Sequence, residues 1–322
     1  AGVAMKRSLI LIALVACVAL ALGFELAPRG YAVRAVCLVL MAASLGQCWN
    51  IVGGLANQIS LGQAAFFGVG AYASTMLQIK YGLSPWIGLP IGMVLAMLLS
   101  ILLSVPTLRL KGPYFTLATL AFGEACRIVA TAATGLTGGP QGVSVPFAGN
   151  SWVMLQFRGA GAYVPVFTGL FVVISVVFVL LAHGRLGYML RAIRENEDAA
   201  EVAGINTLGV RLAGGAISAA LTAAVGTMFA QFTFFIDPDI VFAATSVSIR
   251  AALIAILGGI GTVAGPIIGA VIIVPLEELL SAYLSNKAAG VAPLVFGFIL
   301  IGIVIWRPSG LASLFIIKRG TA

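Results

Sequence analysis

The chain has 322 residues, of which 61% are hydrophobic and only 9% are charged, and its mean hydropathy is +1.12. Soluble domains carry about 25% charged residues, so this composition excludes a soluble globular fold. The net charge of +8 comes from basic residues scattered between apolar runs, without the dense basic stripe of a nucleic-acid-binding protein. The chain is therefore expected to lie in the lipid bilayer and to bind no nucleic acid.

Apolar runs of roughly 20 residues, the length that crosses the hydrocarbon core of a bilayer, recur along the chain. The first run follows Lys6 and Arg7, but it is long enough to span a membrane, so it is interpreted as a membrane helix rather than a cleaved signal peptide. The runs predict an all-α, polytopic integral membrane protein with about ten transmembrane helices. The predicted spans are 8–26, 31–52, 60–79, 85–105, 113–133, 163–182, 208–233, 242–258, 262–283 and 290–306.

Three segments, 53–60, 134–150 and 258–266, are too polar or too rich in glycine to be ordinary lipid-facing helices. Segment 134–150 is predicted to be an external loop, because Pro140 and several glycines interrupt it. The other two segments fall at the ends of predicted spans, where broken or re-entrant backbone is tolerated only against protein or a water-filled path. Both have small residues at similar spacing, which indicates either an internal duplication or ordinary small residues at helix contacts.

Polar and ionisable residues near the first glycine-rich segment are candidates to line a polar path, although hydrogen bonding between helices explains each of them equally well. Glu124 and Arg127 are three residues apart on one predicted helix, which favours a structural ion pair over a functional one. Arg250 could serve either the path or a partner interface. The candidate path residues are Gln58, Ser60, Gln63, Phe66, Tyr72, Thr116, Glu124 and Arg250.

The segment 183–206, between the sixth and seventh predicted spans, holds four of the ten acidic residues and is the most charged part of the chain. Its periodicity predicts one short amphipathic helix from about Arg191 to Ala203, with Gly204 placed to end it. The expected apolar face consists of Met189, Ile193, Ala200 and Ala203, and the expected polar face of Arg191, Arg194, Asp198 and Glu201. Arg191 with Glu195, and Arg194 with Asp198, are expected i,i+4 ion pairs.

Periodicity alone leaves two interpretations of this helix open. It could transmit force from the membrane bundle to a soluble partner, or it could lie on the lipid headgroups. His183, where the sixth span ends, is expected to cap the last helical carbonyls rather than to sense pH.

The basic residues are divided unequally between the two sides of the predicted spans. Cytoplasmic loops carry an excess of Lys and Arg, so the richer side is assigned to the cytoplasm, and both termini are expected there. Arg127 and Arg250 lie within spans. The richer side holds Lys6, Arg7, Arg109, Lys111, Arg185, Arg191, Arg194, Arg211, Arg307, Lys318 and Arg319, and the other side holds Arg29, Arg34, Lys80, Arg158 and Lys287.

Asp198-Ala199-Ala200 followed by Gly204 resembles the EAA-x3-G coupling loop of ATP-binding-cassette import permeases, with Asp in place of the leading Glu. The Ile-x-Leu-Pro that continues the motif in maltose-type permeases does not follow Gly204. The wider loop, from Gly184-Arg185 to Gly204-Ile205, is similar to that of LivM-type branched-chain amino acid permeases. Blocks 59–72, 112–124 and 257–266 also resemble signatures of this family, and their order and spacing make the resemblance specific.

This resemblance implies a type II importer fold, with 1–322 as a single transmembrane permease domain and 183–206 as its cytoplasmic coupling loop. It implies three kinds of partner: a second, LivH-like permease, two ATP-binding-cassette ATPase subunits, and a periplasmic or extracellular solute-binding protein. The implied location is the bacterial inner membrane. The residues implied to couple to the ATPase are Met189, Arg191, Ile193, Arg194, Glu195, Asp198, Ala199, Ala200, Glu201, Ala203 and Gly204.

The sequence contains no G-x-x-x-x-G-K-S/T phosphate loop, so ATP and Mg are expected to bind to the ATPase subunits. The chain itself is expected to have no catalytic residue, metal site, cofactor or ATPase activity.

Two other classes of function remain open. An ion-coupled secondary transporter would need deep carboxylates, of which only Glu124 is expected, and would leave the charged loop without a role. A structural subunit of a larger membrane complex would explain the apolar helices without explaining the coupling-loop motif. Within the importer class, the resemblance leaves urea, amides and aromatic acids as alternative substrates to branched-chain or related hydrophobic amino acids.

Overall fold

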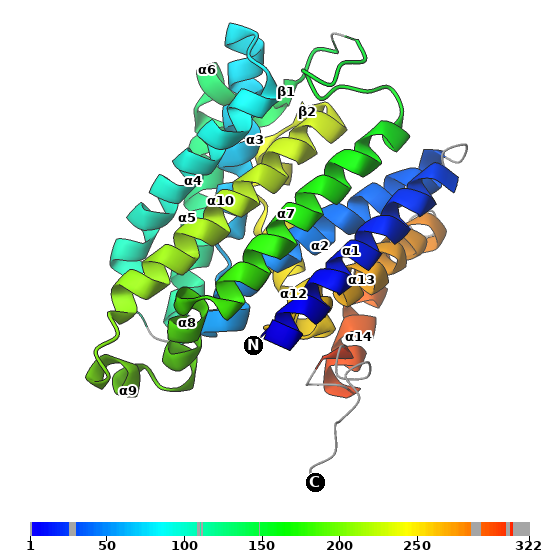
Figure 1. Cartoon of the computed structure of the whole chain (residues 1–322). Coiled ribbons are helices and arrows are strands. Elements are labelled where there is room, and N and C mark those ends of the chain that lie inside the picture. The colour runs from blue at the N-terminus through cyan, green and yellow to red at the C-terminus, as the bar shows by residue number, and fades with distance from the viewer. Residues whose placement is uncertain are drawn as a thin grey trace.

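The computed structural model describes residues 2–25, 30–107, 110, 112–147, 149–284, 291–306 and 310–311. Its long elements are all helices, which confirms the predicted all-α class, and they run side by side in one bundle (Figure 1). These helices are α1 Gly2–Glu25, α2 Gly30–Ala56, α3 Gln63–Tyr81, α4 Pro85–Thr107, α5 Pro113–Ala132, α7 Tyr163–His183, α10 Thr207–Thr233, α12 Arg250–Gly258, α13 Ala264–Leu284 and α14 Val291–Trp306.

Within the described residues, eight helical segments are long and apolar enough to cross a membrane, and the chain is a multi-pass membrane protein. The predicted count of ten spans is not confirmed. Predicted span 60–79 falls on α3, whose hydropathy is lowered by Gln63, Gln78 and Lys80, and predicted span 290–306 falls on α14, which has only 16 residues. Both helices still belong to the bundle, because α3 packs against α4 and α10, and α14 packs against α13.

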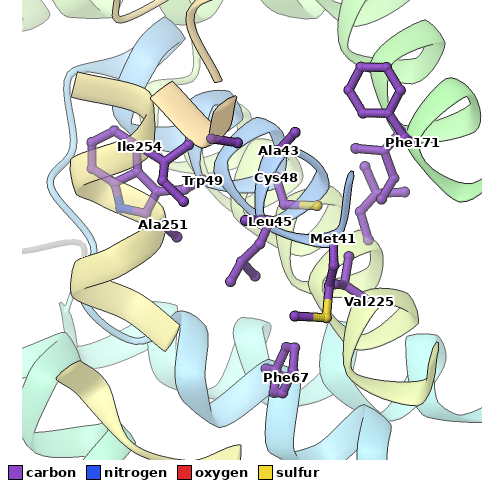
Figure 2. Packing of buried hydrophobic residues seen from close by; sticks show 14 of the residues in the cluster. Met41, Ala43, Leu45, Cys48, Trp49, Phe67, Phe171, Val225, Ala251 and Ile254 are labelled. Carbon is purple, nitrogen blue, oxygen red and sulfur yellow. The ribbon is translucent and has the colours of Figure 1, made fainter. Parts of the chain in front are cut away.

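Helix α2 lies at the centre of the bundle, in contact with α7, α10, α12 and α13. All of its residues from Leu40 to Ala56 are buried. Figure 2 shows Trp49 and other α2 side chains packed with Phe67 of α3, Phe171 of α7 and Ile254 of α12. A helix buried on every side has no polar stripe, so periodicity does not reveal which of its residues contact which neighbour.

Helices α3 and α10 approach each other closely at glycines. A Cβ atom at Gly70 would lie 2.1 Å from the carbonyl oxygen of Ala223, and a Cβ atom at Gly226 would lie 2.1 Å from that of Phe67. Because backbone atoms occupy both positions, only glycine fits, as at other close contacts between membrane helices. This contact brings polar side chains of α3 and α10 together in the site described below.

The predicted loop 134–150 consists, in its described part, of short elements at one end of the bundle: α6 Thr134–Thr137, the 3-10 turn η1 Gly139–Gln141 and strand β1 Val143–Ser144. Strand β1 pairs antiparallel with β2 Phe235–Ile236, with Val143 opposite Ile236. The remaining short elements are the 3-10 turn η2 Ala160–Ala162, α11 Pro238–Val241 and the π-helical turn η3 Ala244–Ile249.

Helices α8 Arg185–Glu195 and α9 Glu197–Val202 lie at the other end of the bundle, where α1 also begins (Figure 1).

Candidate functional site

The charged segment 183–206 forms two helices, α8 and α9, rather than the single helix predicted over Arg191–Ala203. The chain bends at Asn196, whose backbone is extended (φ −160°, ψ 112°). The Asn196 side chain accepts a hydrogen bond from the Ala199 amide at 3.0 Å and thereby caps the start of α9. The prediction of one helix was wrong. The helical periodicity of the sequence continues through position 196, but asparagine prefers to cap a helix, and Asn196 ends α8 and begins α9.

Gly204 follows the last turn of α9, as predicted. Its φ of +84° is in the left-handed region that favours glycine. Its amide donates to the Glu201 carbonyl at 2.9 Å, and the Ile205 amide donates to the Ala200 carbonyl at 3.0 Å. These bonds satisfy carbonyls at the end of the helix and turn the chain back toward α10.

Apolar residues of α8 and α9 are buried inside the chain. Leu190, Ile193 and Ala200 are only 1%, 3% and 4% exposed, and α8 packs against α2, α7 and α10. Ile193 and Ala200 are therefore not available for the apolar contact with a partner that the periodicity predicted, and Met189 is partly covered. Of the predicted apolar face, Ile193 and Ala200 therefore pack on the protein's own bundle, whereas Ala203 is exposed.

The exposed tip of the loop is a different set of residues. Val202 is 92% exposed, and Ala199 and Ala203 beside it are also exposed. The loop also carries exposed charged residues, including Glu195 at the end of α8 and Glu201 on α9. We call Ala199, Val202 and Ala203 the loop tip. Val202 was not among the predicted coupling residues.

Polar contacts fix the loop to the bundle. Arg191 donates from Nε to the Gly187 carbonyl at 3.2 Å and also to the Ala182 carbonyl at the end of α7. Arg194 donates from Nη1 to the Gly54 carbonyl on α2 at 2.8 Å. Both arginines thus bind backbone carbonyls. Within the chain, the sequence predicted only their i,i+4 pairing with Glu195 and Asp198.

An ion pair and a hydrogen bond join α9 to the start of α10. Nη1 of Arg211 lies 2.6 Å from Oε1 of Glu197, and the two side chains are 11% and 23% exposed. The Thr207 hydroxyl donates to Oε1 of Glu201 at 2.6 Å. Sequence reasoning missed Glu197 and Arg211 because no local spacing links them. His183 contacts the Val179 carbonyl through Nδ1 at 2.9 Å, which agrees with the predicted capping role.

The first predicted break in the helices is confirmed, although α2 continues through Gly53 and Gly54 to Ala56 and the break is 57–62. Side chains of neighbouring helices satisfy its backbone. The Trp49 indole donates to the Ser60 carbonyl at 2.8 Å, the Thr116 hydroxyl donates to the Ile59 carbonyl at 2.8 Å, and the Leu61 amide donates to Thr119 at 3.0 Å. Irregular backbone within a membrane bundle is tolerated when protein groups bind it in this way.

The second break is also confirmed, between α12 and α13, where Gly259 and Gly261 have φ of +133° and +76°. Asn50 of α2 holds it. Its side-chain oxygen accepts from the Gly261 amide at 2.7 Å, and its side-chain nitrogen donates to the Thr262 carbonyl at 2.9 Å. Two consecutive residues of α2, Trp49 and Asn50, therefore bind the two breaks.

The first break lines two cavities. The larger, of about 640 Å³, lies beside Gln58 and Thr116, with Arg194, Glu197 and Arg211 on its wall. The smaller, of about 30 Å³, is lined by Gln58, Ser60, Gln63 and Phe66 together with Thr119 and Arg211.

The structure thus brings together five of the predicted path residues: Gln58, Ser60, Gln63, Phe66 and Thr116. Gln63 also hydrogen-bonds Ser218 and Thr222 of α10, at 3.0 and 2.8 Å. Hydrogen bonding between helices, the alternative role considered for Gln63, is therefore present.

Tyr72, Glu124 and Arg250 do not line these two cavities. Tyr72 stacks on Phe242, with ring centroids 5.9 Å apart. Glu124 accepts from Nε of Arg127 at 2.9 Å, as the i,i+3 spacing predicted. Arg127 also pairs with Asp239 on α11.

Arg250 pairs with Glu277 of α13 at 2.8 Å. Glu124 is not the only carboxylate within a candidate membrane span of the described residues, because Glu277 and Glu278 lie in the last two turns of α13. Sequence reasoning missed them because they follow a long apolar run near the end of a predicted span.

Known proteins resemble the chain along nearly its whole length. Residues 27–304 match the family described as "Branched-chain amino acid transport system / permease component". The "High-affinity branched-chain amino acid transport system permease protein LivM" of Escherichia coli is 32% identical over 332 residues, covering 96% of this chain and 76% of the relative. The protein of the same name from Salmonella typhimurium is 30% identical, again over 332 residues and with 96% and 76% coverage.

The "High-affinity branched-chain amino acid transport system permease protein LivH" of Escherichia coli is 31% identical over 182 residues, 55% of this chain and 57% of the relative. No solved structure matches the chain.

Proposed function

This chain belongs to the branched-chain amino acid transport permease family, and from that premise we propose how it acts within an importer. With a second, LivH-like permease it encloses a path for branched-chain or related hydrophobic amino acids. Two ATP-binding-cassette ATPase subunits supply the free energy, and an external solute-binding protein delivers the substrate. The similarity to both LivM and LivH proteins supports a pair of related permeases.

The α8–α9 loop is the observation that carries this proposal. Its apolar face is buried in the bundle, and Arg191, Arg194 and Glu197 fix it to α7, α2 and α10. A helix that lies on lipid headgroups presents a wide apolar face to them. Here the exposed residues are charged, polar or small apart from Tyr188 and Val202, and these two side chains do not form the wide apolar face of a headgroup-lying helix, which favours docking into a groove of a soluble partner.

The loop tip is tested by Val202→Asp. An unpaired carboxylate in a desolvated apolar contact costs more than about 1.4 kcal/mol, so association with the ATPase subunits is expected to weaken at least about tenfold. The measurement is copurification of the ATPase subunits with the tagged permease pair, followed by titration. Val153→Asp, at a 63% exposed valine between β1 and α7, is the matched control and should leave association unchanged. Equal ATPase association of the two variants would refute docking through the loop tip.

The same proposal places the protein in the bacterial inner membrane with the α8–α9 end in the cytoplasm. Support comes from the excess of basic residues assigned to that side and from the start of α1 at the same end (Figure 1). A reporter that is active only in the periplasm should be inactive when fused at Asn196 and active at Val153. The reverse pattern would invert the topology.

The nucleotide chemistry belongs, in this proposal, to the partner subunits, which bind ATP and Mg. The chain contributes the path and the contact that couples it to hydrolysis. Support for a structural role of the charges within the helices comes from their pairing, since Arg127 binds Glu124 and Arg250 binds Glu277. A carboxylate paired with arginine is poorly placed to carry the protons or ions that drive a secondary transporter.

The substrate class follows from the family description and the names of the relatives. Urea, amides and aromatic acids are the alternatives within the importer class. Selectivity in this scheme is set mainly by the solute-binding protein, so a ligand-binding assay on that protein distinguishes the alternatives.

A further inference from the structure

The last two turns of α2, from Trp49 to Ala56, contact both helix breaks. We call this segment the α2 end. The Trp49 indole binds the Ser60 carbonyl in the first break, and the Asn50 side chain binds the Gly261 amide and the Thr262 carbonyl in the second. The two breaks are about two hundred residues apart in sequence, yet their backbones are hydrogen-bonded to adjacent residues of one helix.

Glycines allow these side chains to lie flat against α2. A Cβ atom at Gly53 would lie 2.3 Å from the Trp49 ring. A Cβ atom at Gly54 would lie 2.1 Å from Oδ1 of Asn50 and 2.8 Å from the Gly261 amide nitrogen. The second break therefore approaches the α2 end so closely that only glycine fits at position 54.

The α8–α9 loop binds the α2 end at the same point. The last four carbonyls of a helix have no partner within it, and Gly54 provides one of them. Nη1 of Arg194 donates to this carbonyl at 2.8 Å. A Cβ atom added to Gly261 would lie 3.3 Å from the Gly54 oxygen and 3.5 Å from Nη1 of Arg194. Helix α8, the α2 end and the second break therefore meet at this point.

We propose that Arg194 is a positioning residue that links the α8–α9 loop to both helix breaks through the α2 end. A displacement of α8 moves the Gly54 carbonyl and, because the helix is rigid, moves Trp49 and Asn50 with it. The two breaks then shift together rather than one at a time. This inference rests on the proposed function, since it requires that the ATPase subunits displace the loop.

The alternative is that Arg194 only supplies a hydrogen bond to the otherwise unpaired Gly54 carbonyl and thereby stabilises the fold. The two roles predict different measurements. A stabilising residue affects the melting temperature and the amount of complex, whereas a linking residue affects the number of substrate molecules imported per ATP hydrolysed.

The test compares Arg194→Ala and Arg194→Lys with Arg7→Ala, which removes an exposed charge from α1 at the same end of the bundle. Each variant is assembled with its permease partner, ATPase subunits and solute-binding protein in proteoliposomes, and uptake and ATP hydrolysis are measured together. Arg194→Ala is expected to lower the import per ATP about tenfold, a typical size for coupling between sites. Arg194→Lys should restore most of it, because only one donor binds Gly54. Arg7→Ala should match the unmodified protein.

An unchanged ratio of import to hydrolysis in an assembled Arg194→Ala complex would overturn the link while leaving the importer function intact. A lowered melting temperature with an unchanged ratio would assign Arg194 a stabilising role only, which also overturns it. Failure of the proposed function itself has a separate signature, because the unmodified chain would then not assemble with ATPase subunits at all.

Discussion

Replacing Asn50 with leucine is expected to abolish import and to destabilise the bundle. The substitution keeps the approximate volume of the side chain but removes the partners of the Gly261 amide and the Thr262 carbonyl. A fully buried backbone group left without a hydrogen bond costs about 1–3 kcal/mol, which is the upper bound for each of these partly buried groups. The leucine side chain would occupy the fully buried site of Asn50 and face the two groups without binding them, so the second break loses its fixed position.

Gln47, one turn earlier on α2, provides the matched control. It is also fully buried, but within the described residues its side-chain oxygen and nitrogen have no hydrogen-bond partner. Gln47→Leu therefore removes an unpaired amide, whose burial costs about 1–3 kcal/mol, and should leave the melting temperature unchanged or raise it. The melting temperatures of both variants in detergent and their uptake in proteoliposomes check this contrast. Equal loss of stability at the two positions would contradict a specific role for Asn50.

Gly226→Leu is expected to prevent accumulation of the folded protein. The new side chain would begin 2.1 Å from the Phe67 carbonyl oxygen, and neither α3 nor α10 can move apart without breaking the Gly70 contact as well. Overpacking a tight core typically costs about 1–3 kcal/mol, and more where the opposing atoms are backbone.

The control for this packing prediction is Gly169→Leu on α7, where no heavy atom of the described part of the chain lies within 4 Å of the added Cβ. Monodisperse protein recovered after detergent extraction, measured by fluorescence-detected size exclusion, should fall to near zero for Gly226→Leu and remain normal for Gly169→Leu. Normal recovery of the Gly226 variant would mean that α3 and α10 are not in backbone contact.

Local patterns predicted the parts of the fold that depend on local physics. Long apolar runs located the helices, although α3 is too polar and α14 too short to be confirmed as spans by length and composition. Glycine clusters located both breaks, and Gly204 was correctly placed after the last turn of α9. In each case the relevant property, apolarity or freedom to adopt a positive φ, belongs to the residue itself.

Features that depend on distant contacts were not predicted. Ile193 and Ala200 were assigned to a partner surface, but both are buried, and α8 packs against α2, which is distant in sequence, as well as against the flanking helices α7 and α10. Asn50 and Trp49 lie in a helix buried on all sides, so no polar stripe marks them. Arg194 was predicted to couple, but its contact with Gly54 joins residues 140 positions apart.

Uptake of radiolabelled leucine by proteoliposomes tests the central claim most directly. The vesicles contain this chain, its permease partner and the ATPase subunits, with the solute-binding protein on the delivery side and ATP on the α8–α9 side. We predict concentrative uptake that requires ATP and every one of these components and that Val202→Asp abolishes. Leucine uptake driven by an ion gradient, by this chain without the ATPase subunits or ATP, would contradict the account.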